Sequence, residues 1–325
     1  KESYINLNKR FGISILNPTG TVDLLTVDGN RMSLNLVGVM SYVGSGDHVL
    51  ADAQITSNDL GSTFDTGIDF DFSGSALGNV AIVSNRAEGT KYFSRLTADQ
   101  DAQVAFEIRD NCPFGTVLTP FADGINVEML ADATANCRLN GTISGNRVTI
   151  PLQGFGEGIQ VVQRGAGTML VEILNNTINL DGGFLEGIRV ETREGVNGNL
   201  QATIKNNTIK MTGTEPGCGI NMLGGGGAVT DRQTLCIDIA QNTVNDGTAG
   251  GAPDYQLVQR FGAAPGDNPF HLDGLGALSG TNAAVVEAFI NGRNQGTPDT
   301  WVVTSLPRSD VNYTDADCDT PPVDP

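Results

Sequence analysis

One short pattern recurs along this chain and constrains its fold more than any other feature. An Ile or Val is followed three residues later by Asn, and usually by another apolar residue two positions further on, as in "ILNNTI". The phrase occurs eight times, with its asparagines at Asn30, Asn58, Asn85, Asn111, Asn146, Asn176, Asn207 and Asn242. Successive asparagines are 26 to 35 residues apart. A repeat of this length is typical of a solenoid, in which each coil covers the apolar face of the next.

A second phrase, Gly-Ile-x-apolar, runs in step with the first. It begins at Gly12, Gly67, Gly124, Gly158, Gly187 and Gly219. The alternation of apolar residues in both phrases predicts at least two short strands in each coil, with every second side chain pointing inward. Equivalent strands of neighbouring coils would pair in parallel, at a spacing of about 4.8 Å.

The recurring asparagine has a physical reason at a bend between two strands of a coil. Backbone N–H and C=O groups leave the sheet there, and each would be buried without a partner at a cost of about 1–3 kcal/mol. An Asn amide both donates and accepts hydrogen bonds, and it tolerates turn dihedral angles. We therefore expect the eight asparagines to form a hydrogen-bonded ladder inside the rod.

The phrases "GIRV" and "ATIKNNTI" resemble the repeats of right-handed parallel β-helix proteins of the pectate-lyase-like superfamily, over roughly residues 12–260. The resemblance implies an all-β solenoid of about eight or nine coils. That superfamily includes polysaccharide lyases and hydrolases, phage tailspikes and bacterial surface adhesins, so the fold does not choose among these activities. The stretch from "CIDIAQNTV" to "VVEAFINGRNQG" resembles the C-terminal region of bacterial secreted or cell-surface β-helix proteins. This second resemblance implies an extracellular or cell-surface location in a bacterium.

The chain divides into three predicted regions: a β-helix over 1–265, a capping region over 266–310 and a Pro- and Asp-rich tail or linker over 311–325. In the capping region, "TNAAVVEAFINGRNQG" predicts the one clear helix, with Thr281 as N-cap and Gly292 near its end. A cap is expected because an open solenoid end exposes apolar core and unpaired strand edges. The chain starts at Lys1 rather than Met, which predicts a processed chain or a piece of a longer one.

Charge and hydropathy restrict the partners. The formal net charge is −18, which opposes unaided binding to nucleic acid or anionic lipid. Apolar runs are far shorter than the roughly 20 residues of a membrane-spanning helix. We expect neither a nucleic-acid partner nor membrane insertion.

The five cysteines leave two interpretations open. They are an odd set without CxxC spacing: Cys112, Cys137, Cys218, Cys236 and Cys318. They are either scattered buried thiols, or they form two local disulfides, Cys112 with Cys137 and Cys218 with Cys236, leaving Cys318 free.

Candidate catalytic residues are few. Asp69 and Asp71 in "GIDFDF" share an outward face, where paired carboxylates suit a glycoside hydrolase or a calcium site. Arg189 and Glu191 lie in two outward columns made otherwise mainly of amides and apolar residues, and they are expected to form a solvated ion pair. No cofactor is predicted apart from calcium as a candidate ligand, and the identity of any metal site stays open.

The sequence favours a non-catalytic extracellular protein, a rod that serves as an adhesin, a surface layer or a filament subunit. Its expected partners are further copies of itself, joined head to tail, or surface glycans. The alternative is a polysaccharide lyase or glycoside hydrolase that acts in a groove along the helix, with Asp69, Asp71, Arg189 and Glu191 as its residues. A phage tailspike-like receptor-binding protein is a further alternative.

Overall fold

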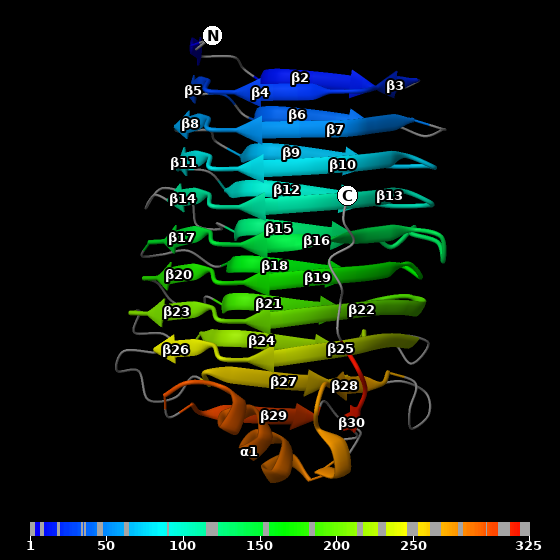
Figure 1. Ribbon diagram of the computed structural model, residues 1–325, viewed down its shortest axis with the longest axis vertical. Helices are drawn as coiled ribbons and strands as arrows, with labels where there is room; N and C mark the ends of the chain where they lie inside the picture. The colour runs from blue at the N-terminus through cyan, green and yellow to red at the C-terminus, as the bar shows by residue number, and fades with distance from the viewer. Residues whose placement is uncertain are drawn as a thin grey trace.

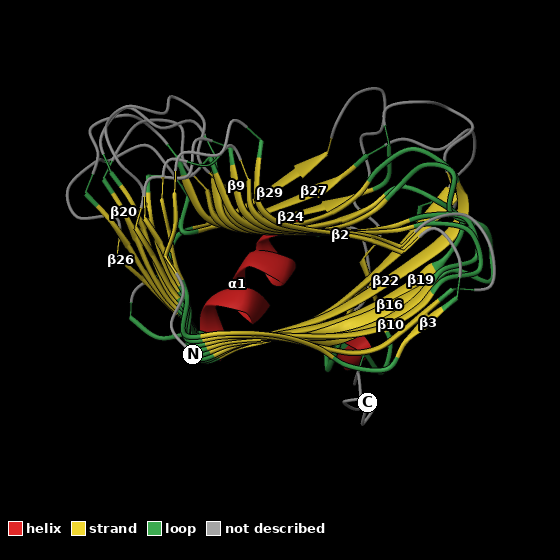
Figure 2. Ribbon diagram, turned by 90° about the horizontal axis from the view of Figure 1, so that it is seen from above, coloured by secondary structure: helices red, strands yellow, loops and turns green. Residues whose placement is uncertain are grey.

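The computed structural model describes residues 4–6, 10–17, 20–33, 35, 37–43, 48–61, 65–89, 91–114, 123–151, 156–181, 186–212, 217–226, 232–245, 253–260, 268–278, 282–296, 298–304 and 313–318. Within these ranges the chain is almost entirely β-strand, and the strands stack into three parallel sheets that wind around a common interior (Figures 1 and 2). The predicted parallel β-helix is confirmed.

From β6 to β26, each coil adds one strand to each sheet, in the order sheet B, sheet C, sheet A. Sheet A comprises β1 (Tyr4–Asn6), β5 (Arg31–Ser33), β8 (Asp59–Gly61), β11 (Arg86–Glu88), β14 (Cys112–Phe114), β17 (Arg147–Ile150), β20 (Thr177–Leu180), β23 (Thr208–Met211) and β26 (Thr243–Asn245). Sheet B comprises β2 (Phe11–Asn17), β6 (Val37–Val43), β9 (Thr66–Phe72), β12 (Tyr92–Ala98), β15 (Asp123–Met129), β18 (Glu157–Gln163), β21 (Glu186–Thr192), β24 (Cys218–Gly224), β27 (Tyr255–Gln259) and β29 (Thr300–Thr304). Sheet C comprises β3 (Thr21–Val22), β4 (Leu25–Asp28), β7 (Val49–Thr56), β10 (Leu77–Val83), β13 (Gln103–Arg109), β16 (Arg138–Ser144), β19 (Thr168–Leu174), β22 (Val196–Lys205), β25 (Arg232–Ala240), β28 (Phe270–Leu272) and β30 (Tyr313–Asp315).

The core is a set of columns in which like residues stack on like. Ile143 aligns with Ile173, and Ile173 aligns with Ile204, in neighbouring strands of sheet C. All three side chains are fully buried. Alternate residues therefore close the interior of every coil, as the period of two in the sequence predicted.

The asparagines lie at the corner between sheets C and A, and each follows a residue in the left-handed backbone region. The preceding residues are Gly29, Ser57, Ser84, Asp110, Gly145, Asn175, Asn206 and Gln241, with φ between 56° and 65°. Such a residue turns the chain sharply out of the sheet C strand, which frees backbone groups at the corner. The first Asn of "NNT" is thus the turn residue, and the second points inward.

All eight predicted asparagines belong to one ladder. At Asn146, the backbone N–H and the side-chain Nδ2 both donate to Oδ1 of Asn176, each at 3.0 Å. Nδ2 also donates to the carbonyl oxygen of Ile108 at 2.8 Å. The same contacts join each asparagine to the next from Asn58 to Asn242, and these seven residues are at most 1% exposed. Asn30 bonds to Asn58 in the same way at the N-terminal end of the ladder, where it is half-buried.

The Gly-Ile phrase marks a close approach of backbones in sheet B. A Cβ atom on Gly158 would lie 2.6 Å from the carbonyl oxygen of Gly187 and 2.6 Å from Cγ2 of Ile178. A side chain at this position would therefore push neighbouring coils apart, so the glycine is required by packing rather than by its dihedral angles.

A helix covers the last coil, at the lower end of the stack in Figure 1. α1 (Ala283–Arg293) begins after Asn282, whose side chain accepts from the N–H of Ala284 at 3.1 Å, and it buries Val286 and Ile290. The proposed N-cap Thr281 lies outside the described residues. A short 3-10 turn, η1 (Gly276–Leu278), precedes the helix.

The helix end supplies a ninth amide to the ladder. Asn294, at the C-cap of α1, accepts from the N–H and from Nδ2 of Asn242, each at 3.1 Å, and donates to the carbonyl oxygen of Ile290 at 2.8 Å. Arg293 binds the buried Asp238 of β25 at 2.8 Å. The helix ends at Arg293, one residue after Gly292, and the C-cap Asn294 also closes the ladder.

The described part of the predicted tail, residues 313–318, is attached to the stack. β30 pairs with β28, Tyr313 is fully buried, and Cys318 forms a disulfide with Cys236 of β25. Strands β28, β29 and β30 extend sheets B and C beyond residue 265, so the capping region is continuous with the stack.

Candidate functional site

The outer face of sheet B carries the two columns predicted from the Gly-Ile phrase. Register pairs join Asn126, Gln160, Arg189, Asn221 and Gln256 in one column. They join Glu128, Val162, Glu191, Leu223 and Val258 in the other. Both columns are confirmed. Several members are buried although they point away from the core, among them Asn126, Asn221 and Glu191.

Arg189 and Glu191 are the centre of a buried ionic network, not a solvated pair as predicted. The Glu191 side chain is 0% exposed and binds Arg189 at 2.6 Å, Arg193 at 2.7 Å and Arg260 at 2.9 Å. Burial alone would raise the pKa of Glu191, but the three guanidinium groups lower it below its usual value. Glu191 is therefore a firmly ionised link between β21 and the residue that follows β27.

A second row of acids adjoins this network and was missed in the sequence. Asp123, Glu157 and Glu186 are the first residues of β15, β18 and β21, and Arg189 reaches Glu157 at 3.0 Å and Glu186 at 3.6 Å. Each acid directly precedes the glycine of a Gly-Ile phrase, so "DGI", "EGI" and "EGI" were the available signal.

Burial raises the pKa of two of these acids. Burial raises the pKa of Asp123 to about 8, and a hydrogen bond shared with Glu157 and that group's charge add to the shift. The N–H of Glu157 also donates to Oδ1 of Asp123, at 2.9 Å. Burial raises the pKa of Glu186 too, against the opposing effects of Arg189 and Asn221. An acid that stays protonated near neutral pH, beside a second carboxyl group, can act as a proton donor.

Asp69 and Asp71 lie elsewhere on the same sheet. Asp69 makes a two-pronged contact with Arg95, at 2.9 and 2.8 Å, and Asp71 accepts from Thr97 at 2.9 Å. Burial raises the pKa of Asp71, and the bond from Thr97 opposes this. β9 and β21 are four strands apart in sheet B, or about 19 Å. The structure therefore does not bring Asp69 and Asp71 together with Arg189 and Glu191.

Metal binding finds no geometric support in the described part of the chain. No group of three or more His, Cys, Asp or Glu side chains within those ranges is placed to hold an ion. The calcium expectation stays a prediction.

The cysteine pairing differs from both local disulfides that the sequence suggested. Cys236 bonds Cys318, 82 residues away, with their Cα atoms 5.5 Å apart, while Cys112, Cys137 and Cys218 are free thiols. Burial raises the pKa of Cys137 to about 12. In each suggested local pair, the two cysteines lie at different sheets. Cys112 is the first residue of β14 in sheet A, whereas Cys137 directly precedes β16 of sheet C. Cys218 is the first residue of β24 in sheet B, whereas Cys236 lies in β25 of sheet C.

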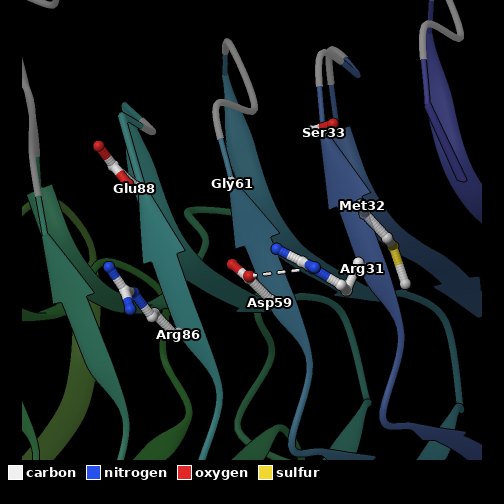
Figure 3. Close-up of a pocket in the computed structure, with 7 residues that line it drawn as sticks. All are labelled: Arg31, Met32, Ser33, Asp59, Gly61, Arg86 and Glu88. Carbon is white, nitrogen blue, oxygen red and sulfur yellow. Dashed lines mark ion pairs between the residues drawn. The ribbon is translucent and has the colours of Figure 1, made fainter. Parts of the chain in front are cut away.

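A second candidate region lies on the outer face of sheet A, where β5, β8 and β11 border a shallow hollow of about 490 Å³ (Figure 3). It is lined by Arg31, Met32, Ser33, Asp59, Gly61, Arg86 and Glu88. Arg31 and Asp59 form an exposed ion pair at 3.5 Å across it.

Comparison with known proteins gives no name to this arrangement. No protein-family model, no curated protein and no solved structure matches the chain. Within the described ranges, α1 and η1 are both too short to span a bilayer. The architecture defines the chain as a parallel β-helix solenoid, and its activity is inferred from its own residues.

Proposed function

We propose that this chain is a non-catalytic, extracellular structural or adhesive protein, a rigid rod that serves as a surface or filament subunit. The Gly-Ile and Asn phrases also support a relation to the pectate-lyase-like superfamily, and to bacterial secreted or cell-surface β-helix proteins. The observation that carries the proposal is the unbroken ladder from Asn30 through Asn242 to Asn294.

The ladder supports a structural role because it joins each coil to the next through hydrogen bonds of both side chain and backbone. Ten strands in sheet B correspond to a rod of about 45 Å. In a repeat protein, stability is roughly the sum of each unit and its contacts with its neighbours, so a continuous ladder resists opening at any one coil. Such stiffness suits a spacer or a filament element.

The charges on sheet B are consistent with the same role. Glu191 joins β21 to Arg260, which lies after β27, and Arg189 joins it to Glu157 on β18. The network therefore spans several coils. Its charges are directed mainly at one another, which is the arrangement of a cross-link between coils.

The disulfide supports an extracellular location. Cys236–Cys318 ties the last described segment to β25, and such bonds persist in oxidising compartments. Antibody labelling of intact source cells, together with electron microscopy of the purified chain, tests the proposal. Surface label and end-to-end assemblies are expected. Single particles and no label on the cell surface would argue against it.

Self-association would use different surfaces at the two ends of the rod. α1 covers the last coil and Asn294 already occupies the end of the ladder, so a further coil cannot extend the ladder at that end. A head-to-tail contact would instead meet the outside of α1. Ala284 and Ala288 are exposed there, and substituting both with Glu should break filaments without disturbing the buried Val286 and Ile290.

A second candidate function, a glycoside hydrolase or polysaccharide lyase, is favoured by the neighbouring Asp123 and Glu157, where burial raises the pKa of Asp123 to about 8. The assay is release of reducing or unsaturated sugars from acidic and neutral polysaccharides, with calcium and with a chelator. Release that disappears in Asp123→Asn, but survives in the exposed control Asp132→Asn, would establish an enzyme. No release from any polymer would leave the structural role as the better account.

A further inference from the structure

Sheet A carries a row of arginines on its outer face, in a chain that is otherwise strongly acidic. In register along the sheet, Arg31 is followed by Asp59, Arg86, Cys112 and Arg147. Arg86 and Arg147 are thus two strands apart, or about 9.6 Å along the rod. Both side chains are exposed.

These two arginines have no partner among the described residues. Neither guanidinium group makes a hydrogen bond or an ion pair there, although acidic residues outnumber basic ones by 37 to 19. By contrast, Arg95, Arg164, Arg189 and Arg260 on or beside sheet B all bind carboxylates. Within this row, Arg86 and Arg147 therefore present unpaired positive charge to solvent, two strands apart, whereas Arg31 pairs with Asp59.

An exposed aromatic ring lies on the strand between them. Phe114, 48% exposed, shares the outward face of β14 with Cys112, and it aligns with Glu88 on one side and Thr149 on the other. An aromatic face flanked by polar groups is a stacking platform for a sugar ring, since one end of the contact is apolar and the other is wet.

The hollow at Arg31 and Asp59 lies on the N-terminal side of Arg86 on the same face of sheet A (Figure 3). Gly61 leaves it open, since its position carries no side chain, and Asp59 and Glu88 offer oxygens that accept hydrogen bonds from hydroxyl groups. The face thus alternates: an anion-binding arginine, a site for an uncharged ring, and a second arginine.

We propose that sheet A binds a linear acidic heteropolysaccharide in which a carboxylated sugar alternates with an uncharged one. The carboxylates pair with Arg86 and Arg147, and the uncharged ring between them stacks on Phe114. The inference rests on the adhesive part of the proposed function and names the class of its partner. The charge of −18 and the interleaved Asp59 and Glu88 oppose binding of a densely charged polymer such as nucleic acid.

The test measures binding of the whole chain to immobilised hyaluronan, in which a uronate alternates with an N-acetylated amino sugar. Polygalacturonate, charged at every sugar, neutral dextran and duplex DNA serve as comparison polymers. We expect hyaluronan to bind best, and its affinity to fall as salt is added.

Variants locate the site. Arg86→Gln and Arg147→Gln should each weaken binding about fivefold, as expected for exposed ion pairs. Phe114→Ala should cost about fivefold through lost stacking. Gly61→Leu should weaken binding of long polymer chains only, because the leucine side chain would fill the hollow. The substitution should be tolerated, since a Cβ atom at this position would meet nothing closer than Asp59 Oδ1 at 3.8 Å.

Matched controls on sheet C remove the same groups elsewhere. Arg138→Gln takes away one exposed charge, and Leu77→Ala takes away one exposed apolar side chain. Both should bind as the parent chain does. Equal losses in the controls, stronger binding of polygalacturonate or DNA, or no binding of any polymer would each overturn the proposal. If the chain is displayed on cells but fails these assays, only this inference is wrong. If it binds the polymer but is never displayed on cells, the proposed function is wrong.

Discussion

Replacing one amide in the middle of the ladder should be among the most destabilising single changes in this chain. In Asn146→Ala, the Nδ2 bond to the carbonyl oxygen of Ile108 is lost, and so are the two bonds that Asn111 donates to Oδ1 of residue 146. The backbone N–H of residue 146 keeps its bond to Asn176. Three buried groups are therefore left unpaired: the Ile108 carbonyl and two N–H groups of Asn111.

Each orphaned group costs about 1–3 kcal/mol, so the three together set a range of roughly 3–9 kcal/mol. Entry of a water molecule into the space left by the amide would satisfy part of this demand. We expect a loss near the lower end, about 3–5 kcal/mol, in the free energy of unfolding measured by urea titration with circular dichroism.

Asn30→Ala is the matched control. Asn30 is half-buried, and its Nδ2 bonds only the Asp28 carbonyl and Asn58. Because water can reach these groups, the cost should stay below about 1 kcal/mol. If Asn146→Ala costs no more than Asn30→Ala, the buried amides of the ladder do not stabilise the rod.

Three further perturbations test the networks around the ladder. Because the folded-state pKa of Asp123 lies above its unfolded value of about 3.9, its contribution is complete at low pH and is lost as pH rises toward about 8. Asp123→Asn should therefore flatten the fall in urea midpoint between pH about 5 and about 8, and an unchanged fall would assign it to another group. Glu191→Gln should lower the free energy of unfolding by roughly 3–5 kcal/mol, since it leaves three arginines around an uncharged side chain. A loss no larger than that of Arg193→Gln would contradict a network centred on Glu191. Cys318→Ser should lower the free energy of unfolding by about 2–4 kcal/mol, and it should speed amide hydrogen exchange at 268–278 and 313–318 only. Faster exchange at β16 or β19 would mean that the disulfide stabilises the whole rod.

The architecture was predictable because one physical demand recurs in every coil. A corner that buries backbone groups selects an amide, and the Ile three residues earlier fixes which side of the strand faces inward. The same alternation that put Asp69 and Asp71 on the outward face implies that Ile68, Phe70 and Phe72 face inward, and these three are fully buried.

The closure of the ladder was not predictable from that pattern. Asn294 is 52 residues from Asn242 and stands at the end of a helix, so neither the period nor the Ile-x-x-Asn phrase marks it. Its position depends on how α1 docks, through Val286, Ile290 and the Arg293–Asp238 ion pair.

The candidate sites were predicted only in part. Outward columns could be aligned from the Gly-Ile phrase, which brought Arg189 and Glu191 into view. Their burial depends on contacts between coils, such as Arg260 reaching Glu191 at 2.9 Å, which the repeat itself does not encode. The disulfide likewise depends on where the chain returns after β29, so cysteines close in sequence were the wrong guide.

The most direct test of the ladder is hydrogen exchange of the asparagine side chains in a chain labelled with 15N at Asn. The Nδ2 protons of Asn85, Asn146 and Asn207 each donate to a carbonyl and to the next amide, and these side chains are about 1% exposed. They should remain protected long after those of the exposed Asn136 and Asn197 have exchanged. Exchange of all these side chains at the same fast rate would contradict a continuous buried ladder.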